Sequence, residues 1–195
     1  MITLHVGIDD TDSPRMGCTT YIASLLVEKF EKIGAKFIDY PNLVRLNPNV
    51  PWKTRGNGAL CLRIQIKEEL LDEIIDITLD AIEENADLEY KGTDPGAIFF
   101  PAEKIPEEIK TFSKKTIQGI VKKEEALKLI RKFGAEAAGF KKGRGIIGAL
   151  AAVGETLEAD HTYELIAYRT PENRGLPRKI DVKSIFEMDT NTKPY

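Results

Sequence analysis

Three aspartates stand close together near the N-terminus, directly after an apolar run. Asp9, Asp10 and Asp12 lie within four positions, in the stretch GIDDTDS. Carboxylates crowded this closely repel one another, so they are tolerated where water screens them or where a cation binds. A hard divalent cation such as Mg²⁺ prefers several carboxylate oxygens and often shares its coordination sphere with phosphates. The same spacing also fits a solvated turn that caps itself, because Asp, Thr and Ser are common capping residues.

The residues that follow this acidic turn could receive a phosphate group. Gly17 precedes the expected start of a helix, where free backbone N–H groups favour an anion. The hydroxyls of Thr11, Ser13, Thr19 and Thr20 surround the same turn. A helix cap is the usual role for Thr19 or Thr20, but a hydroxyl beside a metal could also accept a phosphoryl group. Carboxylates for Mg²⁺ next to a phosphate-receiving helix end are typical of phosphoryl transfer.

Positive charge is concentrated in two stretches that also contain glycine. The first is LNPNVPWKTRGNG at residues 46–58, and the second is KKGRG at residues 141–145, just before a run of small residues. Their basic and polar candidates for contact with an anion are Lys53, Arg55, Asn57, Lys142 and Arg144. Both stretches also fit ordinary solvated turns, with Trp52 as a core aromatic residue.

The composition excludes several classes of protein. The net charge of −3 argues against a uniformly basic nucleic-acid binder, and residues 68–90 carry ten acids with no Lys or Arg. No apolar run is long enough for a transmembrane helix, and the N-terminus does not resemble a signal peptide. Two cysteines cannot form a disulfide framework or a four-cysteine zinc ribbon, so we expect a cytoplasmic protein without a membrane partner.

Hydrophobic periodicity predicts the elements that must position these residues. Strands are predicted at residues 2–8, 36–46, 59–66 and 97–100, and helices from Thr20 to Gly34 and from Leu70 to Ile82. The order is β-α-β-β-α-β over roughly residues 1–101, which is the ferredoxin-like arrangement. In the third strand, Arg63 and Gln65 alternate with apolar residues, so we expect this strand to be half-buried.

The remainder of the chain is predicted to elaborate this α/β (α+β) fold. Helices are expected at residues 106–121, 123–133 and 145–154, and a late strand at 162–169. His5 and His161 have no second ligand at metal spacing and are interpreted as structural. Because no linker is evident, we expect a single domain over residues 1–195.

Several blocks of this sequence, in their order along the chain, resemble a known family. The blocks are IDDTDS with CTT, RLNP, KTRGNG, DPG, and KGRGIIGALAAVG with ELIAYR. They are similar to the archaeal tRNA(Ile) 2-agmatinylcytidine synthetase family over about residues 4–189. The resemblance implies an N-terminal catalytic domain, named a threonine–cytidine kinase, that binds ATP. It further implies a ligase that acts on the wobble cytidine of tRNA(Ile) with a CAU anticodon and joins agmatine at C2 through phosphorylated intermediates.

The resemblance also implies roles for individual residues. Asp9, Asp10 and Asp12 match the acids that bind Mg²⁺ and ATP, and Thr19 matches the threonine that is autophosphorylated. Thr20 remains the alternative acceptor. The other residues expected at the nucleotide are Thr11, Ser13, Gly17, Thr20, Lys53, Arg55, Asn57, Lys142 and Arg144.

The family pattern continues beyond the last residue of this sequence, with a second ferredoxin-like domain, an OB-fold and a zinc ribbon. The OB-fold and ribbon are expected to be absent here, so the chain should bind Mg·ATP but modify tRNA poorly. Two alternatives stay open. One is a Mg-dependent phosphohydrolase or phosphotransferase for a small molecule, although the D-x-D-x-T/V pattern meets Pro14 where Thr or Val belongs. The other is a non-catalytic module that binds RNA or a nucleotide.

Overall fold

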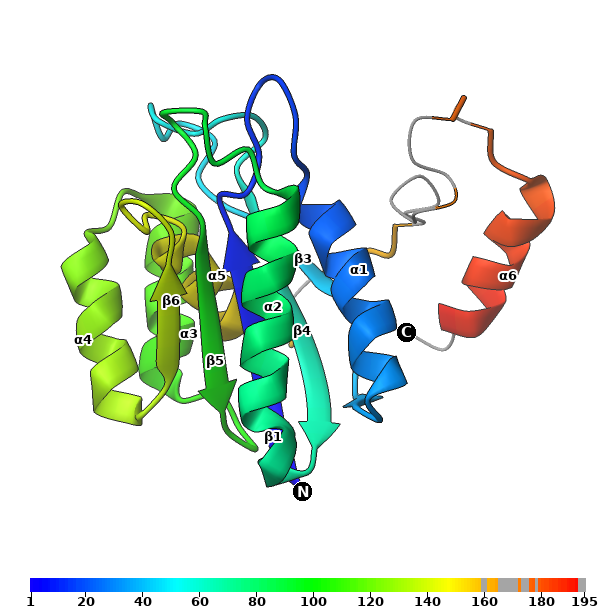
Figure 1. The fold of residues 1–195 in the computed structure, drawn as a ribbon, viewed down its shortest axis with the longest axis horizontal. Helices are drawn as coiled ribbons and strands as arrows, with labels where there is room; N and C mark the ends of the chain where they lie inside the picture. The colour runs from blue at the N-terminus through cyan, green and yellow to red at the C-terminus, as the bar shows by residue number, and fades with distance from the viewer. Residues whose placement is uncertain (159–160, 165–171, 173–175, 178, 193–195) are drawn as a thin grey trace. The chain divides into compact units, whose positions relative to one another are not determined.

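The computed structural model describes residues 1–158, 161–164, 172, 176–177 and 179–192 (Figure 1). The chain divides into two compact units, Met1–Thr156 and Leu157–Tyr195. The elements in chain order are β1 (Ile2–Asp9), α1 (Thr19–Lys32), β2 (Lys36–Phe37), β3 (Asn42–Arg45), β4 (Gly58–Ile66), η1 (Glu68–Leu70), α2 (Leu71–Asn85), β5 (Gly96–Pro101), α3 (Glu107–Gln118), α4 (Lys123–Phe133), β6 (Glu136–Gly139), α5 (Ile146–Gly154) and α6 (Val182–Thr192).

The first unit is built on one antiparallel sheet. Its strand order is β2-β4-β1-β5-β6, and β3 also pairs with β4. In the centre, Val6 of β1 lies opposite Leu62 of β4 and Phe99 of β5. The mixed α/β class predicted from the sequence is therefore confirmed. The ferredoxin-like assignment stays a prediction, and the sheet carries an additional edge strand, β6, that the periodicity did not indicate.

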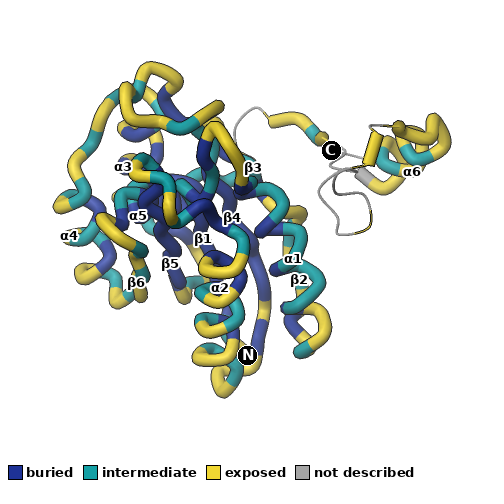
Figure 2. Tube along the Cα trace, turned by 45° about the horizontal axis from the view of Figure 1, so that its top comes forward, coloured by how far each residue is buried: buried dark blue, intermediate teal, exposed yellow. Residues whose placement is uncertain are grey.

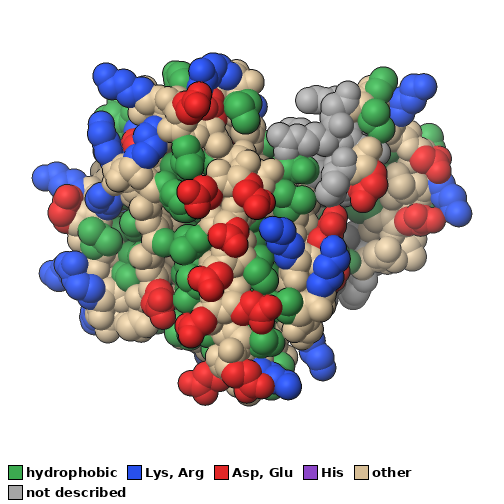
Figure 3. Space-filling model, in the orientation of Figure 1, with side chains coloured by type: hydrophobic (Ala, Val, Ile, Leu, Met, Phe, Trp, Pro, Cys, Tyr) green, Lys and Arg blue, Asp and Glu red, His purple; other side chains and the backbone are tan. Residues whose placement is uncertain are grey.

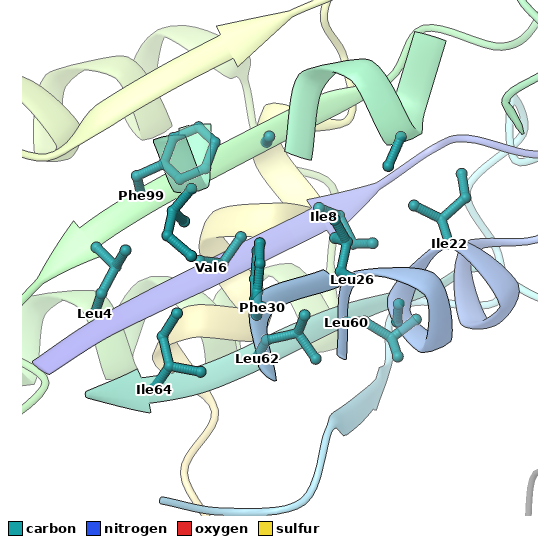
Figure 4. Packing of buried hydrophobic residues seen from close by; sticks show 14 of the residues in the cluster. Leu4, Val6, Ile8, Ile22, Leu26, Phe30, Leu60, Leu62, Ile64 and Phe99 are labelled. Carbon is teal, nitrogen blue, oxygen red and sulfur yellow. The ribbon is translucent and has the colours of Figure 1, made fainter. Parts of the chain in front are cut away.

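Helices cover both faces of this sheet. Helices α1 and α2 lie on one face, and α3 and α5 lie on the other (Figure 1). The core on the first face packs Ile22, Leu26 and Phe30 of α1 against apolar side chains of β1 and β4 (Figure 4). The central strands are consequently buried along most of their length, while exposed residues gather in the loops and outer helices (Figure 2).

The second helical layer corrects one prediction. The alternation in β4 predicted a half-buried strand with one apolar face. Cys61 and Arg63 on the other face are also buried, in addition to the apolar positions Leu60, Leu62, Ile64 and Ile66. The reason is that α5 packs so closely on the sheet that a Cβ at Gly7 would overlap the backbone carbonyl of Ala149. A small-residue helix is needed for this approach, and the predicted helix over 145–154 supplies it.

Other boundaries follow from local chemistry. The predicted extended segment 36–46 divides into β2 and β3 on either side of Pro41, because proline cannot donate a ladder hydrogen bond. The helix 123–133 ends at Gly134, which has a φ of 65°. The strand predicted at 162–169 falls mostly outside the described residues.

The surface of α2 matches the acidic character of its sequence. Its exposed carboxylates form a band down the middle of the view in Figure 3. Lysine and arginine side chains are found around the loops at the top of the same view. An anionic ligand is thus expected at the loops and not along α2. Among the helices that the structure describes, none has both the length and the apolar character needed to span a membrane.

Candidate functional site

Loops that are distant in the sequence meet at the end of the sheet where β1 stops and β5 begins. They are residues 10–18, 46–57, 86–95 and 140–145, and they lie at the top of Figure 1. Side chains of the first loop form hydrogen bonds or ion pairs with all three of the others. The acidic turn and both basic stretches are therefore brought together, although they are up to 134 positions apart.

Asp10 is held by the loop that precedes α5. Its Oδ2 accepts a hydrogen bond from Arg144 Nη2 at 2.7 Å and one from the backbone N–H of Asp94 at 3.2 Å. Arg144 also donates to the carbonyl of Gly92 at 2.6 Å and lies 3.6 Å from a carboxylate oxygen of Asp94. Asp10 has a φ of 59°, a left-handed conformation that aspartate tolerates better than most residues.

Burial changes the proton affinity of Asp10. Desolvation raises the pKa of this carboxyl to about 6, although the nearby Arg144 guanidinium acts in the opposite direction. A carboxyl with this pKa titrates close to neutral pH, which is a common property of functional sites.

Asp9 lies at the last position of β1 and faces the first turn of α5. A Cβ at Gly148 would overlap its carboxylate, so a glycine is required there. Burial raises the pKa of Asp9 well above its usual value, and the negative charge of Asp10 raises it further. No lysine or arginine among the described residues forms an ion pair with Asp9. This carboxyl is thus the one of the three without a cationic partner.

Asp12 is held by the loop between β3 and β4. Thr54 Oγ1 donates to its Oδ1 at 2.5 Å, and Arg55 Nε donates to its Oδ2 at 2.6 Å. Arg55 Nη2 also donates to the carbonyl of Gly17 at 2.7 Å. The Asp12 side chain is 19% exposed and that of Arg55 is 45% exposed, so this ion pair is open to solvent on one side.

The threonines at the start of α1 lie beside the acidic turn. Thr19 is buried, and its hydroxyl is hydrogen bonded to that of Thr11 at 3.0 Å. Thr20 is half-buried, and its hydroxyl lies 3.0 Å from the thiol of Cys18. Cys18 occupies the N-cap position without a side-chain cap bond, so the expectation that Thr19 or Thr20 caps this helix was wrong.

Ser13 contributes to the structure of the turn. Its hydroxyl donates to Asp87 Oδ2 at 2.6 Å and accepts the backbone N–H groups of Arg15 and Met16. Arg15 donates two hydrogen bonds to Asp87 and lies over the ring of Tyr90. These contacts lower the pKa of the Asp87 carboxyl. Ser13 is therefore part of a fixed network that holds the acidic turn on the 86–95 loop.

The remaining predicted residues contribute less directly. Lys53 Nζ donates to the carbonyl of Arg55, and Asn57 Nδ2 donates to the carbonyl of Asn47, so both stabilise their own loop. The backbone N–H of Lys142 donates to Asp94 at 3.3 Å. Trp52 is 47% exposed, which contradicts the alternative that placed it in the core.

Sequence reasoning missed three residues of the site. Asp94 is buried and contacts Arg144, Lys142 and, through its backbone N–H, Asp10. Thr93 donates to the backbone carbonyl of Asp12, and Thr54 donates to its carboxylate. Asp94 and Thr54 lie in the DPG and KTRGNG blocks, so the sequence carried a signal for them that was not used, whereas no pattern pointed to Thr93.

The site contains oxygen ligands for a divalent cation but no compact set of them. Within the described part of the chain, no group of three or more His, Cys, Asp or Glu side chains converges as a metal site would require. Asp10 and Asp12 each bind an arginine, while no ion pair of Asp9 is found among the described residues. Oxygen ligands of the kind that Mg²⁺ prefers are present. The donor chemistry therefore fits Mg²⁺, although the three carboxylates do not form one ligand set.

Fold and site together define a mixed α/β protein with carboxylates, arginines and hydroxyls on loops at one end of its sheet. The family models that match are the TiaS TCKD domain over residues 5–68 and the TiaS FLD domain over residues 143–195. The chain belongs to the tRNA(Ile2) 2-agmatinylcytidine synthetase (TiaS) family, as its sequence blocks indicated.

Curated relatives support this assignment along nearly the whole chain. The TiaS of Pyrococcus horikoshii is 45% identical over 192 residues, which are 98% of this chain and 45% of that protein. The TiaS of Methanocaldococcus jannaschii is 44% identical over 200 residues, which are 100% of this chain and 47% of that protein. The chain therefore spans about half the length of the curated relatives that it matches.

Solved structures agree with the fold. A TiaS–tRNA(Ile2)–ATP complex matches with a TM-score of 0.78 and 40% identity, covering 100% of this chain and 46% of that one. A TiaS–tRNA(Ile2)–AMPCPP–agmatine complex matches with a TM-score of 0.76 and 38% identity, again covering 100% of this chain and 46% of that one.

Proposed function

We propose that this chain carries the ATP-dependent catalytic part of an enzyme that joins agmatine to C2 of the wobble cytidine in tRNA(Ile) with a CAU anticodon. The observation that carries the proposal is the similarity to curated TiaS proteins over 98% of the chain. The convergence of Asp10, Thr19, Arg55 and Arg144 at one end of the sheet supports it further. Its partners would be this tRNA and agmatine, in the cytoplasm.

The chemistry follows from the poor leaving ability of a carbonyl oxygen. The C2 oxygen of cytosine would attack the γ-phosphorus of ATP as the bond from that phosphorus to its bridging oxygen breaks and ADP leaves. The resulting phosphate ester makes the C2 oxygen a good leaving group. The primary amine of agmatine then forms a bond to C2 as the phosphate departs. An anticodon base in a single-stranded loop is cheap to extrude into such a site.

We assign the residues of this site as follows. Asp9, Asp10 and Asp12 do not form one ligand set in the structure, but each would offer carboxylate oxygens to Mg²⁺. The bound cation would offset charge on the phosphates. Arg55 and Arg144 are suited to phosphate oxygens because guanidinium groups donate paired hydrogen bonds. Residues with supporting positions near the nucleotide are Thr11, Ser13, Gly17, Thr20, Lys53, Asn57 and Lys142.

Thr19 is the proposed acceptor for autophosphorylation. Its hydroxyl is buried and bonded to Thr11, so the two hydroxyls must separate before Thr19 can attack phosphorus. The attack would form an Oγ1–P bond, release ADP and transfer the hydroxyl proton to a neighbouring base. Thr20 is less buried and remains the alternative acceptor.

A direct assay tests the function. The chain is incubated with Mg·ATP, labelled agmatine and a tRNA(Ile)(CAU) transcript, and incorporation is compared with that of a full-length TiaS. We expect Mg·ATP binding by calorimetry and weak incorporation by the chain alone. Absence of Mg·ATP binding at millimolar concentration would contradict the proposal, and full incorporation would contradict the expectation that further domains are needed.

Two controls separate the alternatives. A phospho-aspartate trapped after incubation with ATP would favour a phosphohydrolase, whereas a phosphothreonine favours the proposed kinase chemistry. Binding of RNA without any metal-dependent binding of ATP would favour a non-catalytic module. Asp12→Ala should abolish ATP turnover, and near-normal turnover would remove Asp12 from the proposed ligand set.

A further inference from the structure

The loop between β3 and β4 is attached to the acidic turn by a small set of contacts. We call these the Asp12 latch, and they consist of the carboxylate of Asp12 with Thr54 and Arg55. Each carboxylate oxygen of Asp12 accepts one of these hydrogen bonds, at 2.5 Å from Thr54 and 2.6 Å from Arg55. A further bond from Arg55 to the carbonyl of Gly17 fixes the orientation of the guanidinium group.

A divalent cation bound at Asp12 would compete with the latch for the same carboxylate. A cation on an oxygen of Asp12 would lie close to the Arg55 guanidinium, which has the same sign of charge. The guanidinium has a better partner once ATP is present, because a phosphate accepts its paired N–H donors. The solvent-open side of the pair leaves space for Arg55 to move, since its side chain is 45% exposed.

We propose that Thr54 and Arg55 are positioning residues that hold Asp12, and that Mg·ATP opens this latch and moves the 46–57 loop. The inference rests on the proposed function, because it requires a cation and a triphosphate at this site. Arg55 would exchange the carboxylate of Asp12 for phosphate oxygens. The 46–57 loop would then move together with the bound nucleotide. The position of the loop would therefore depend on whether a nucleotide occupies the site.

The chain contains its own reporter for this movement. Trp52 is its only tryptophan, lies two residues from Thr54 and is 47% exposed. The emission of a half-exposed indole changes with its contact with water. Intrinsic fluorescence therefore reports the position of the 46–57 loop without any label.

The experiment measures Trp52 emission and its quenching by acrylamide during titrations with Mg²⁺ alone and with Mg·ATP. Calorimetry on the same samples reports binding separately. We expect a saturable change in quenching with Mg·ATP in the native chain. In Asp12→Asn the quenching should already differ without ligand, because the ion pair is lost, and should change little on titration.

Conservative variants test the latch itself. Arg55→Lys keeps the charge but loses the paired donors, so Mg²⁺ should bind about two- to fivefold more tightly, as expected when an exposed ion pair is weakened. Thr54→Val keeps a similar side-chain shape but lacks the hydroxyl, so this variant should also bind Mg²⁺ more tightly. Arg15→Lys is the matched control, because its partner is Asp87 and not Asp12.

The outcomes distinguish this inference from the proposed function. Mg·ATP binding by calorimetry with no change at Trp52 would overturn the latch and leave the proposed function intact. No binding of Mg·ATP would overturn both. Equal effects of Arg15→Lys and Arg55→Lys on Mg²⁺ affinity would also overturn it, because a general effect of replacing an arginine by lysine in these loops would then explain the result.

Discussion

An arginine lies among polar groups at each end of α5, but the balance of charge differs between the two ends. At the C-terminal end, Arg63 is 6% exposed and donates to Asn42 Oδ1 at 2.7 Å and to the carbonyl of Glu155 at 2.6 Å. It also donates to His5 Nδ1 at 2.9 Å, while His5 Nε2 donates to the carbonyl of Ala102. The imidazole is thus neutral, and burial beside Arg63 lowers its pKa to about 4.

At the N-terminal end, three carboxyl groups surround one guanidinium. Arg144 binds Asp10 and lies near Asp94, while Asp9 faces the first turn of α5 and forms no ion pair with any residue that the structure describes. Negative charge is in excess there. Burial raises the pKa values of Asp9 and Asp10, and neighbouring carboxylates raise them further. A network with balanced donors and acceptors supports structure, whereas unbalanced buried charge indicates a place for a cationic ligand.

The largest effect is expected at the balanced end. Arg63→Met should lower the free energy of unfolding by about 3 kcal/mol or more, because several buried acceptors lose a charged donor. Urea denaturation measures the change. Lys67→Met is the matched control on an exposed side chain and should stay within about 0.5 kcal/mol of the native chain. A loss at Arg63 below about 1 kcal/mol would mean that the network contributes little.

The pH dependence of His5 provides the next test. Its pKa is about 4 in the folded chain and 6.5 in the unfolded one, so the unfolded state binds more protons between these values. This contribution to stability is complete above pH 6.5 and decreases as the pH falls towards 4. His5→Gln removes it, so the difference between native chain and variant should change by about 2–3 kcal/mol between pH 7 and pH 4.5. A constant difference would show that the ring is not held neutral.

Asp10 should show the opposite sign in nearly the same pH range. Its pKa rises from 3.8 to about 6 on folding, so the ionised carboxylate destabilises the folded chain as the pH increases through this interval. Asp10→Asn should therefore be more stable than the native chain by about 1–3 kcal/mol at pH 7, with the gain disappearing near pH 4.

The same variant should lose Mg·ATP binding, which separates stability from function. Urea midpoints at pH 4 and pH 7, together with calorimetry, measure both effects. A destabilised Asp10→Asn at neutral pH would indicate that the ion pair with Arg144 outweighs the cost of burying the charge. In that case the N-terminal end of α5 would resemble the C-terminal end, and the contrast between them would fail.

The sequence predicted most elements and the chemical types at the site, because periodicity and short blocks are local signals. Arg63 shows where such reasoning ends. Its alternation with apolar neighbours indicated an exposed face, and only the packing of α5 on that face makes it buried. The partners of Asp12 were equally hidden, since Thr54 and Arg55 are more than forty positions away. Pairing across such distances depends on the tertiary fold.

The smallest change in stability is expected at the hydroxyl pair on the site side. Thr19→Val retains the shape of the side chain but leaves the Thr11 hydroxyl without its partner at 3.0 Å. The cost should be about 1 kcal/mol in urea denaturation, as for one buried hydrogen bond. The functional effect should be much larger, because mass spectrometry after incubation with Mg·ATP should detect one added phosphate on the native chain and none on this variant.

Thr20→Val is the matched control for this result. Thr20 is the adjacent, half-buried residue of the same helix, and its hydroxyl lies near the Cys18 thiol and not near Thr11. If Thr19 is the acceptor, Thr20→Val should still gain one phosphate, and fragmentation should locate it at Thr19. Phosphate retained by Thr19→Val and lost by Thr20→Val would assign the acceptor to the more exposed hydroxyl. The Thr11–Thr19 pair would then be structural, like the Arg63 network, and the reactive groups would lie closer to the surface of the loops.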